Sequence, residues 1–346
     1  MTMQIELTQP GPLLNAQGHL TQVGWSRQPL LECNLENAHF YALRFLQRFR
    51  VKRWDYYAIF TPQCFFSATI ADLGYAGNVF VYMLDFASNE LHEEGLVIPL
   101  GRGIQLPRDS MTGETAFVNR QASLRFQAED GMRRVFVDWP GYHKGRGIKT
   151  EIALTCPPEH ESMTIVIPIG AKRFYYNRKI NCLPARGYIH YGDIDEEVYP
   201  HESLGSLDWG RGVWEYRSFW NWASASGYLP DGRTIGLNLG RGFGDLSRAT
   251  ENCVVLDGRI HKLARVNFDY QPGEYMRPWR FADNEGRLDL TFTPFHERVA
   301  RTALAVIDSE VHQIFGRYTG HAQVDDGQEV QVRDLIGFAE EHHARW

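Results

Sequence analysis

The sequence predicts an all-β protein made of two antiparallel β-barrels or sandwiches in tandem. Short segments in which apolar and polar residues alternate recur along most of the 346 residues, at the spacing typical of hairpins. Turn signals such as Pro230-Asp231-Gly232 and Asp257-Gly258 separate these segments. Helical spacing is rare, and the chain is long enough for two units of similar size.

The expected strands divide into two groups. In the first half they lie at residues 54–60, 65–71, 78–85, 123–127, 135–139, 149–156 and 163–168. In the second half they lie at residues 212–222, 233–239, 251–256, 263–270, 287–293, 312–319 and 329–335.

The stretch from Leu35 to Lys52 fits two patterns. It reads either as a helix behind an Asn34 cap or as a strand with one basic face. We expect a strand from about Leu43 onward.

We expect the domain boundary between residues 170 and 200, where the alternation changes into an irregular, turn-rich stretch. We therefore expect an N-terminal β-domain at residues 1–185 and a C-terminal β-domain at residues 186–346. The second group of strands begins soon after this stretch, which supports two units of similar construction.

Composition excludes several classes of function. A net charge of −6 with scattered basic residues argues against nucleic acid as a partner. No apolar run is long enough to span a membrane or to form a signal peptide, so we expect a cytoplasmic protein. The 5 cysteines are far apart without a CxxC pair, which favours reduced thiols over a disulfide framework or a metal site. No motif indicates a cofactor, and the oligomeric state stays open.

Aromatic residues provide the strongest functional signal. Trp214, Tyr216, Trp220 and Trp222 share one period-two register, which predicts four rings on one face of a single strand. Aromatic residues make up 13% of the chain, so we expect these rings to line an enclosed site for an apolar ligand. The alternative is that most of them are core residues of a β-sandwich.

Three titratable residues are candidates for catalysis, because a buried acid or histidine in an apolar cavity can transfer protons near neutral pH. Glu251 begins an apolar strand, His312 lies on an otherwise apolar face, and Asp72 follows an apolar run. The competing interpretations are an edge salt bridge for Glu251, a satisfied core histidine for His312 and a turn-forming carboxylate for Asp72.

Four further residues are candidates for ligand binding. Asn238 lies between glycines that permit close approach of a ligand, and the alternative is that it ties a bulge. Tyr270, Trp279 and Gln313 lie in or beside expected strands of the second half.

The C-terminal segment has a composition similar to that of a metal site. His342 and His343 follow Glu340 and Glu341, but two neighbouring histidines at a terminus lack a fixed third ligand. We expect a solvated tail and no metal.

Several motifs, in their order along the chain, resemble the bacterial family of domains of unknown function numbered 2804. They are KRWDYYAIFTPQCFFSATIADLGYAGNVFVYMLD from Lys52, FWNWASASG from Phe219, GLNLG from Gly236, TEN from Thr250, MRPW from Met276 and HQIFGRYTG from His312. The resemblance covers nearly the whole chain. It implies an architecture similar to tandem lipocalin-like proteins, among them AttH, carotenoid 1,2-hydratases and fungal cyclases of apolar polyenes, and it assigns no catalytic residue.

These features together favour an acid–base enzyme that hydrates, isomerises or cyclises a terpenoid- or lipid-like small molecule in an aromatic cavity. A noncatalytic carrier of a hydrophobic ligand requires the same cavity without a titratable group in it. A carbohydrate-active protein would instead have an open groove with tryptophan faces and paired carboxylates.

Overall fold

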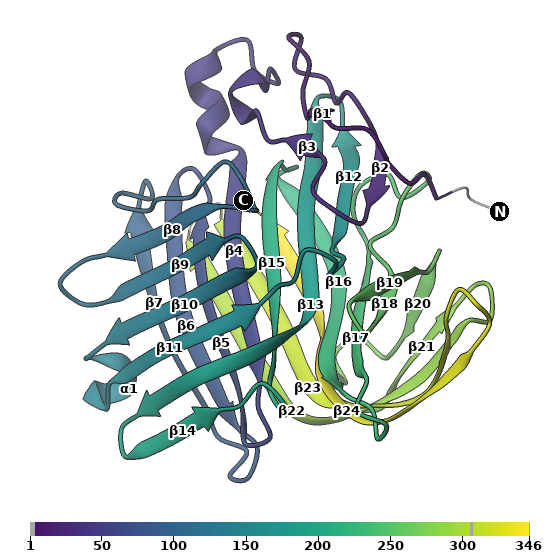
Figure 1. Ribbon diagram of the computed structural model, residues 1–346. Helices are drawn as coiled ribbons and strands as arrows, with labels where there is room; N and C mark the ends of the chain where they lie inside the picture. The colour runs from purple at the N-terminus through teal and green to yellow at the C-terminus, as the bar shows by residue number, and fades with distance from the viewer. Residues whose placement is uncertain (1–3, 305–306, 346) are drawn as a thin grey trace.

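Two curled antiparallel sheets lie side by side and contain nearly all of the regular structure (Figure 1). The computed structural model describes residues 4–304 and 307–345. The architecture confirms the expected all-β fold with lipocalin-like sheets. Among the described helices, none has the length and apolar character that crossing a membrane requires.

The first sheet has the spatial order β7-β6-β5-β4-β15-β13-β11-β10-β9-β8, with β2, β12 and β14 attached at β12 and β13. Its strands are β2 (Gly24–Ser26), β4 (Val51–Phe60), β5 (Cys64–Asp72), β6 (Ala76–Asp85), β7 (Leu91–Pro99), β8 (Gly113–Val118), β9 (Ser123–Glu129), β10 (Met132–Trp139), β11 (Ile148–Thr155), β12 (Met163–Gly170), β13 (Arg173–Tyr191), β14 (Ile194–Val198) and β15 (Leu204–Val213). A small parallel pair, β1 (Gly11–Pro12) and β3 (Leu31–Glu32), precedes it, and the short helices are η1 (Leu35–Asn37), η2 (Arg44–Phe49) and α1 (Tyr142–Gly145).

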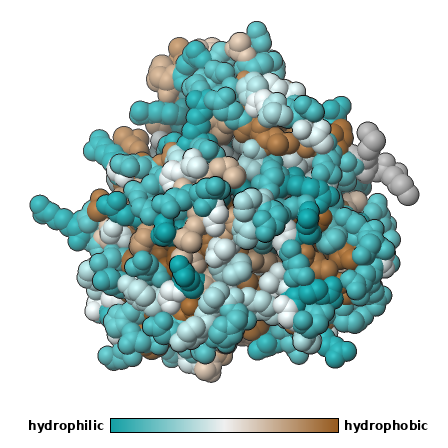
Figure 2. All heavy atoms as spheres, in the orientation of Figure 1, coloured by the Kyte–Doolittle hydropathy of each residue, from teal (hydrophilic) through white to brown (hydrophobic). Residues whose placement is uncertain are grey.

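The second sheet has the order β19-β18-β17-β16-β24-β23-β22-β21-β20. Its strands are β16 (Arg217–Tyr228), β17 (Thr234–Arg241), β18 (Cys253–Leu256), β19 (Arg259–Lys262), β20 (Val266–Asp269), β21 (Trp279–Asp283), β22 (Leu288–Leu304), β23 (Ile307–Gln323) and β24 (Glu329–Arg345). The face seen in Figure 2 is mostly hydrophilic. Antiparallel strands with alternating side chains can turn their polar face toward solvent in this way.

Side-chain alternation gives each sheet an inner face and a face toward the other sheet. On β4, Tyr57 and Ile59 belong to the core enclosed by the first sheet, whereas Tyr56 and Phe60 pack in the cluster that contains Phe315 and Phe338 of the second sheet. The second sheet encloses a separate core of its own. The contact between the sheets is therefore a third layer, made of this aromatic cluster and of a second cluster of aromatic and aliphatic side chains.

The expected strand from Leu43 onward is wrong, because residues 44–49 form the 3₁₀ helix η2 and the strand begins at Val51. The side chain of Gln47 accepts the backbone N–H of Phe40 at 2.9 Å, which closes the segment into a compact loop.

The prediction of an irregular stretch between residues 170 and 200 is also wrong. Its residues form β13 and β14, and β13 is a long strand that pairs with β11, β12, β14 and β15. The polar side chains of β13 form hydrogen bonds with neighbouring strands. Because these polar residues replace apolar ones, the alternation of apolar and polar residues was hidden in the sequence. The expected boundary at residue 185 falls inside β13, whereas the change of sheet falls between Val213 and Arg217. Separate folding of two domains stays a prediction.

Candidate functional site

A β-bulge in β13 directs polar side chains of the first sheet toward the second. The pairing of β13 with β15 shifts register between Ile180 and Leu183, and Cys182 has a φ of 63°, which is unusual for a residue other than glycine. The side-chain amide of Asn181 crosses to β16 and donates to Ser224 Oγ at 2.9 Å. The bulge therefore connects the two sheets through a buried hydrogen bond.

Lys179 lies next to this bulge and is the central cation between the sheets. Its Nζ is 3.0 Å from Asp208 Oδ2 and 3.6 Å from Glu251 Oε2, and it lies 3.7 Å from the centre of the Trp222 ring. Its side chain is only 4% exposed. One amine thus contacts two carboxylates and an aromatic face in a site from which water is largely excluded.

Glu251 reaches this position because residue 240 is a glycine. A Cβ at Gly240 would lie 1.9 Å from Glu251 Oε1, so a larger residue would displace the carboxyl. Burial raises the pKa of Glu251 and outweighs the attraction of Lys179. Its Oε2 has no partner at hydrogen-bond distance among the described residues and forms its ion pair with Lys179 across 3.6 Å.

Asn238 orients the aromatic wall of the site. Its Oδ1 accepts the indole N–H of Trp222 at 2.8 Å, and its Nδ2 donates to the backbone carbonyl of Glu251 at 2.7 Å. The side chain therefore holds the ring that covers Lys179.

A second buried carboxyl, that of Glu340 on β24, lies directly opposite Trp222 on the neighbouring strand. Trp220 Nε1 donates to its Oε1 at 3.1 Å, and Gln313 Nε2 donates to its Oε2 at 3.4 Å. Burial raises the pKa of Glu340 to about 7, although the Trp220 hydrogen bond and the charge of Lys179 favour the ionised form. Glu340 therefore exchanges its proton close to neutral pH.

The prediction of a solvated tail at the C-terminal segment is wrong, because this segment belongs to β24. Glu340 and Glu341 are buried, and the ring of His342 lies 4.0 Å from that of Trp220. Burial lowers the pKa of His342 to about 3, so this histidine is neutral. The segment is ordered because Phe338, Glu340 and His342 continue the alternation of β24.

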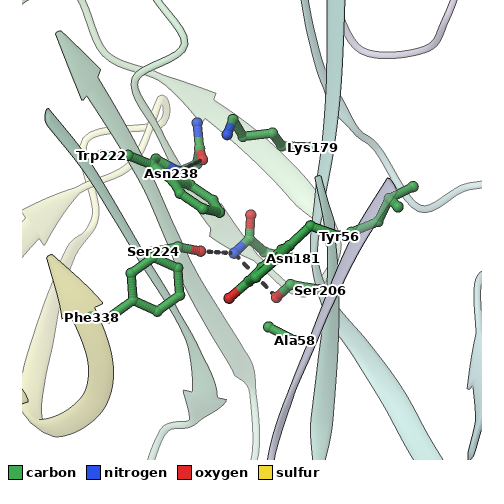
Figure 3. Close-up of a pocket in the computed structure, with 10 residues that line it drawn as sticks. Tyr56, Ala58, Lys179, Asn181, Ser206, Trp222, Ser224, Asn238 and Phe338 are labelled. Carbon is green, nitrogen blue, oxygen red and sulfur yellow. Dashed lines mark hydrogen bonds between the residues drawn. The ribbon is translucent and has the colours of Figure 1, made fainter. Parts of the chain in front are cut away.

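A narrow gap lies between the sheets, and no part of it is wide enough for a water molecule (Figure 3). Trp222 and Asn238 lie at one side of it, with Asn181 and Tyr56 across from Ser224 and Phe338. It is lined by Tyr56, Ala58, Lys179, Asn181, Ser206, Leu207, Trp222, Ser224, Asn238 and Phe338. A ligand can therefore occupy it only after these side chains separate.

The four aromatic residues expected on one strand are divided by a turn. β15 ends at Val213 and β16 begins at Arg217, so Trp214 and Tyr216 lie in the connection. Trp214 is buried and packs 5.5 Å from Trp220, measured between ring centres, whereas Tyr216 is exposed. Only Trp220 and Trp222 share a strand face, and that face meets the first sheet.

His312 lies on the inner face of the second sheet, away from the cavity. Its Nδ1 is 2.7 Å from Glu297 Oε1 and its Nε2 is 3.1 Å from Glu310 Oε1, and its ring stacks on Tyr275. Burial lowers the pKa of His312, but the two carboxylates outweigh burial, so the net effect is a raised pKa. The structure places His312 in an ion-pair network.

Tyr270 and Trp279 lie on the same inner face and stack with their ring centres 3.9 Å apart. Glu341 accepts hydrogen bonds from the hydroxyls of Tyr270 and Tyr275. Burial raises the pKa of Glu341, but these two bonds and His343 outweigh burial and lower it. We call Tyr270, Tyr275, His312 and Glu341 the inner-face cluster, and Lys179, Asp208, Glu251 and Glu340 the inter-sheet cluster.

Asp72 lies at the end of β5, apart from both clusters. Its Oδ2 is 2.5 Å from Arg53 Nη2, and its Oδ1 accepts the backbone N–H of Gly74 at 2.8 Å. These contacts match the turn-forming interpretation of Asp72.

The sequence matches the family described as domain of unknown function (DUF2804) over residues 4–346. The chain belongs to this family. No curated protein matches it by sequence.

Two solved structures resemble this member of the family in fold. An AttH-like protein from Nitrosomonas europaea is 15% identical, with a TM-score of 0.54 over 87% of this chain and 97% of its own. Kievitone hydratase from Nectria haematococca is 13% identical, with a TM-score of 0.53 over 85% of this chain and 88% of its own. At these identities the similarity establishes a shared fold.

Sequence reasoning overlooked three members of the inter-sheet cluster: Lys179, Asp208 and Glu340. Lys179 lies in the stretch that we took as irregular, and Glu340 in the segment that we took as a tail. The alternation of Phe338, Glu340 and His342 was the sequence signal that could have placed Glu340 on a strand. Nothing in the sequence indicates that Lys179 and Glu251 meet, because the contact depends on how the sheets pack.

Other potential sites are less suited to acid–base chemistry. In the part of the chain that the structure describes, no group of three or more His, Cys, Asp or Glu side chains is placed to hold a metal ion. A second, open groove of about 550 Å³ is lined by Arg217, Ser218, Phe219, Asp308, Glu310, His343, Ala344 and Arg345. Its carboxylates Asp308 and Glu310 both lie within salt-bridge distance of arginine, and the hydrogen bond from Arg345 lowers the pKa of Asp308.

Proposed function

We propose that the protein is an acid–base enzyme that acts on an apolar small molecule between its two sheets, by hydration, isomerisation or cyclisation. The observation that supports it most is Glu340, a buried carboxyl beside Trp220 with a pKa raised to about 7. A carboxylic acid with this pKa is partly protonated at neutral pH and regains its proton readily after donating it.

The aromatic surroundings suit a reaction that passes through a cation. Glu340 would donate its proton to a double bond of the substrate, and the faces of Trp220 and Trp222 would stabilise the positive charge that develops on carbon. Trp222 already interacts in this way with the ammonium group of Lys179. The cation, before or after it closes a ring, either adds water and releases a proton from the added water or loses a proton from carbon, and this released proton restores the Glu340 carboxyl.

Lys179 and Glu251 have supporting roles in this proposal. Lys179 balances the charge of Asp208, and its positive field limits how far burial raises the pKa of Glu340. Glu251, whose pKa is also raised, provides a second carboxyl that can accept the proton lost by the intermediate. The charge of Lys179 favours the ionised form of both carboxyls.

Two further observations bear on the competing functions. The fold is shared with a protein named as a hydratase, and this supports the reaction class without identifying the substrate. Trp220 and Trp222 lie between the sheets rather than along an open groove, which disfavours stacking on a polysaccharide. A carrier remains the main competitor, since Lys179 is the one residue other than tyrosine that can titrate in the cavity lining.

The first experiment identifies the ligand. Native mass spectrometry of the protein purified from its own host should show a bound apolar molecule, which the purified protein then converts into a product of altered mass or retention time. If the parent protein binds this molecule and returns it unchanged, it is a carrier.

The second experiment assigns the acid. Glu340→Gln and Glu251→Gln keep the side-chain size and remove the titratable group, and we expect Glu340→Gln to lower kcat by at least about 100-fold. Glu341→Gln is the matched control on the same strand and should keep most of the activity. Turnover by both Glu340→Gln and Glu251→Gln at the parent rate contradicts the proposal.

A further inference from the structure

The segment of residues 39–50, between η1 and β4, exposes an unusual run of apolar side chains. Tyr41 is 39% exposed, Leu43 is 58% exposed and Phe45 is 67% exposed. All residues from Tyr41 to Phe45 are exposed. Consecutive exposed apolar residues lower solubility and persist mainly where they serve an interaction.

Contacts with a buried side chain and with the first sheet hold the backbone of this segment in place. Gln47 is buried, and its Oε1 accepts the backbone N–H groups of Phe40 at 2.9 Å and Tyr41 at 3.5 Å. Gly74 lies so close that a Cβ there would be 1.9 Å from the backbone oxygen of Arg48. The loop is thus anchored to the first sheet while Leu43 and Phe45 point into solvent.

The segment is also locally basic in an acidic protein. From residue 37 to residue 54 the sequence contains no Asp or Glu, although the chain carries a net charge of −6. Arg44 and Arg48 are exposed beside Leu43 and Phe45. The apolar side chains are therefore flanked by cations.

The position of the segment relates it to the inter-sheet cluster. Arg50, at its end, donates from Nη2 to the backbone oxygen of Trp214 at 2.7 Å. Trp214 packs on Trp220, which donates to Glu340. The segment projects beyond the ends of the strands (Figure 1), and hydrophobic atoms lie beside hydrophilic ones at this projection (Figure 2).

We propose that residues 39–50 dock the protein onto a membrane surface with anionic lipids. Leu43 and Phe45 enter the boundary between headgroups and acyl chains, while Arg44 and Arg48 contact lipid phosphates. The basic flanks select an anionic bilayer over an uncharged apolar partner. Docking at this point brings the aromatic layer around Trp214 next to the membrane, where apolar molecules are most concentrated.

The test measures sedimentation of the full chain with vesicles and requires no enzyme activity, so its outcome is independent of the proposed function. We expect binding to vesicles of phosphatidylcholine mixed with phosphatidylglycerol, and weak binding to phosphatidylcholine alone. Phe45→Glu should lower the partition coefficient by at least about 10-fold, because it removes an inserted ring and adds a repelled charge. Arg48→Gln should lower it by about fivefold.

Val118→Glu is the matched control, since Val118 is 50% exposed on β8, and it should bind like the parent. Melting temperatures of both glutamate variants should equal that of the parent, because neither residue is buried. Absence of binding to the anionic vesicles, or equal binding by Phe45→Glu and Val118→Glu, overturns the proposal. A parent dimer that Phe45→Glu dissociates, without vesicle binding, would identify the surface as a contact between copies of this chain.

Discussion

The inter-sheet cluster and the inner-face cluster use the same kinds of residue with opposite electrostatic results. Both place glutamates among aromatic rings, and Glu340 and Glu341 are even neighbours on β24. Burial raises the pKa of Glu340 to about 7. For Glu341, burial is outweighed by hydrogen bonds from Tyr270, Tyr275 and His343, and its pKa is lowered.

Because both carboxyls are buried, this difference shows that the hydrogen-bond donors around a buried carboxyl determine what it can do. A glutamate with several donors stays ionised and stabilises the fold, whereas a buried glutamate with few donors keeps a proton that it can transfer. Alternation along one strand is enough to send adjacent glutamates to these two environments.

We expect the largest effect on stability from replacing Lys179, the cation of the inter-sheet cluster. Lys179→Met leaves Asp208 and Glu251 buried without their positive partner, so we expect unfolding free energy to fall by about 3–5 kcal/mol. Urea denaturation measures this loss. Lys149→Met, at an exposed position of β11, should stay within about 0.5 kcal/mol of the parent. A loss as small as that of Lys149→Met would mean that the cluster is solvated.

Glu340 and Glu341 should respond to pH with opposite signs. The pKa of Glu340 is about 7 in the folded protein against an ordinary value of 4.5, so its contribution is full below pH 4.5 and is lost as pH rises toward 7. At about 1.4 kcal/mol per pKa unit, the loss amounts to about 3 kcal/mol. Glu341, whose pKa is lowered, contributes above pH 4.5 and loses its contribution as pH falls.

Urea denaturation of Glu340→Gln and Glu341→Gln from pH 4 to pH 8 tests these signs. Glu340→Gln should gain stability relative to the parent as pH rises, and Glu341→Gln should gain relative to the parent as pH falls. Parallel profiles for the two variants would show that their environments do not differ as described.

Trp220→Phe should move the Glu340 titration while leaving the inner-face cluster unchanged. The substitution removes the N–H donor at 3.1 Å that stabilises the carboxylate, so the pKa of Glu340 should rise further. The accompanying destabilisation should be about 1 kcal/mol above neutral pH. Infrared titration of the carboxylic acid band, with Glu340→Gln to assign it, measures the shift. An unchanged titration would show that the hydrogen bond is not formed in solution.

The smallest effect is expected at His312. Its ion pairs with Glu297 and Glu310 are partly solvated, since the side chains are 17%, 28% and 36% exposed, so His312→Gln should cost about 0.5–1 kcal/mol. Because the pKa of His312 is raised, this contribution is present below pH 6.5 and disappears as pH rises through the folded pKa. A denaturation profile without this decline would show that the ion pairs do not stabilise the protein. A strong effect of His312→Gln on turnover would instead assign His312 to the catalytic site.

The sequence by itself determined the fold class and much of the strand layout. Period-two alternation depends only on neighbouring residues, so the strands near Tyr56, Trp222 and Ile314 were predictable without tertiary information. It also singled out Trp220, Trp222, Asn238 and Glu251 as candidates, since polar groups and large rings among apolar strands stand out locally, and their part in a functional site stays a prediction. His312 and Asp72 stood out for the same reason, but they lie elsewhere.

Only the tertiary structure decided which of these residues meet and what charge they carry. Alternation assigns a side chain to one face of a strand but cannot say what packs against that face, so the approach of Lys179 on β13 to Glu251 was hidden. The β13 strand itself was obscured because Asn177, Lys179 and Asn181 are polar and their side chains bond to partners far along the chain. The pKa of Glu340 follows from the exclusion of water between two sheets, and no single segment of sequence contains that information.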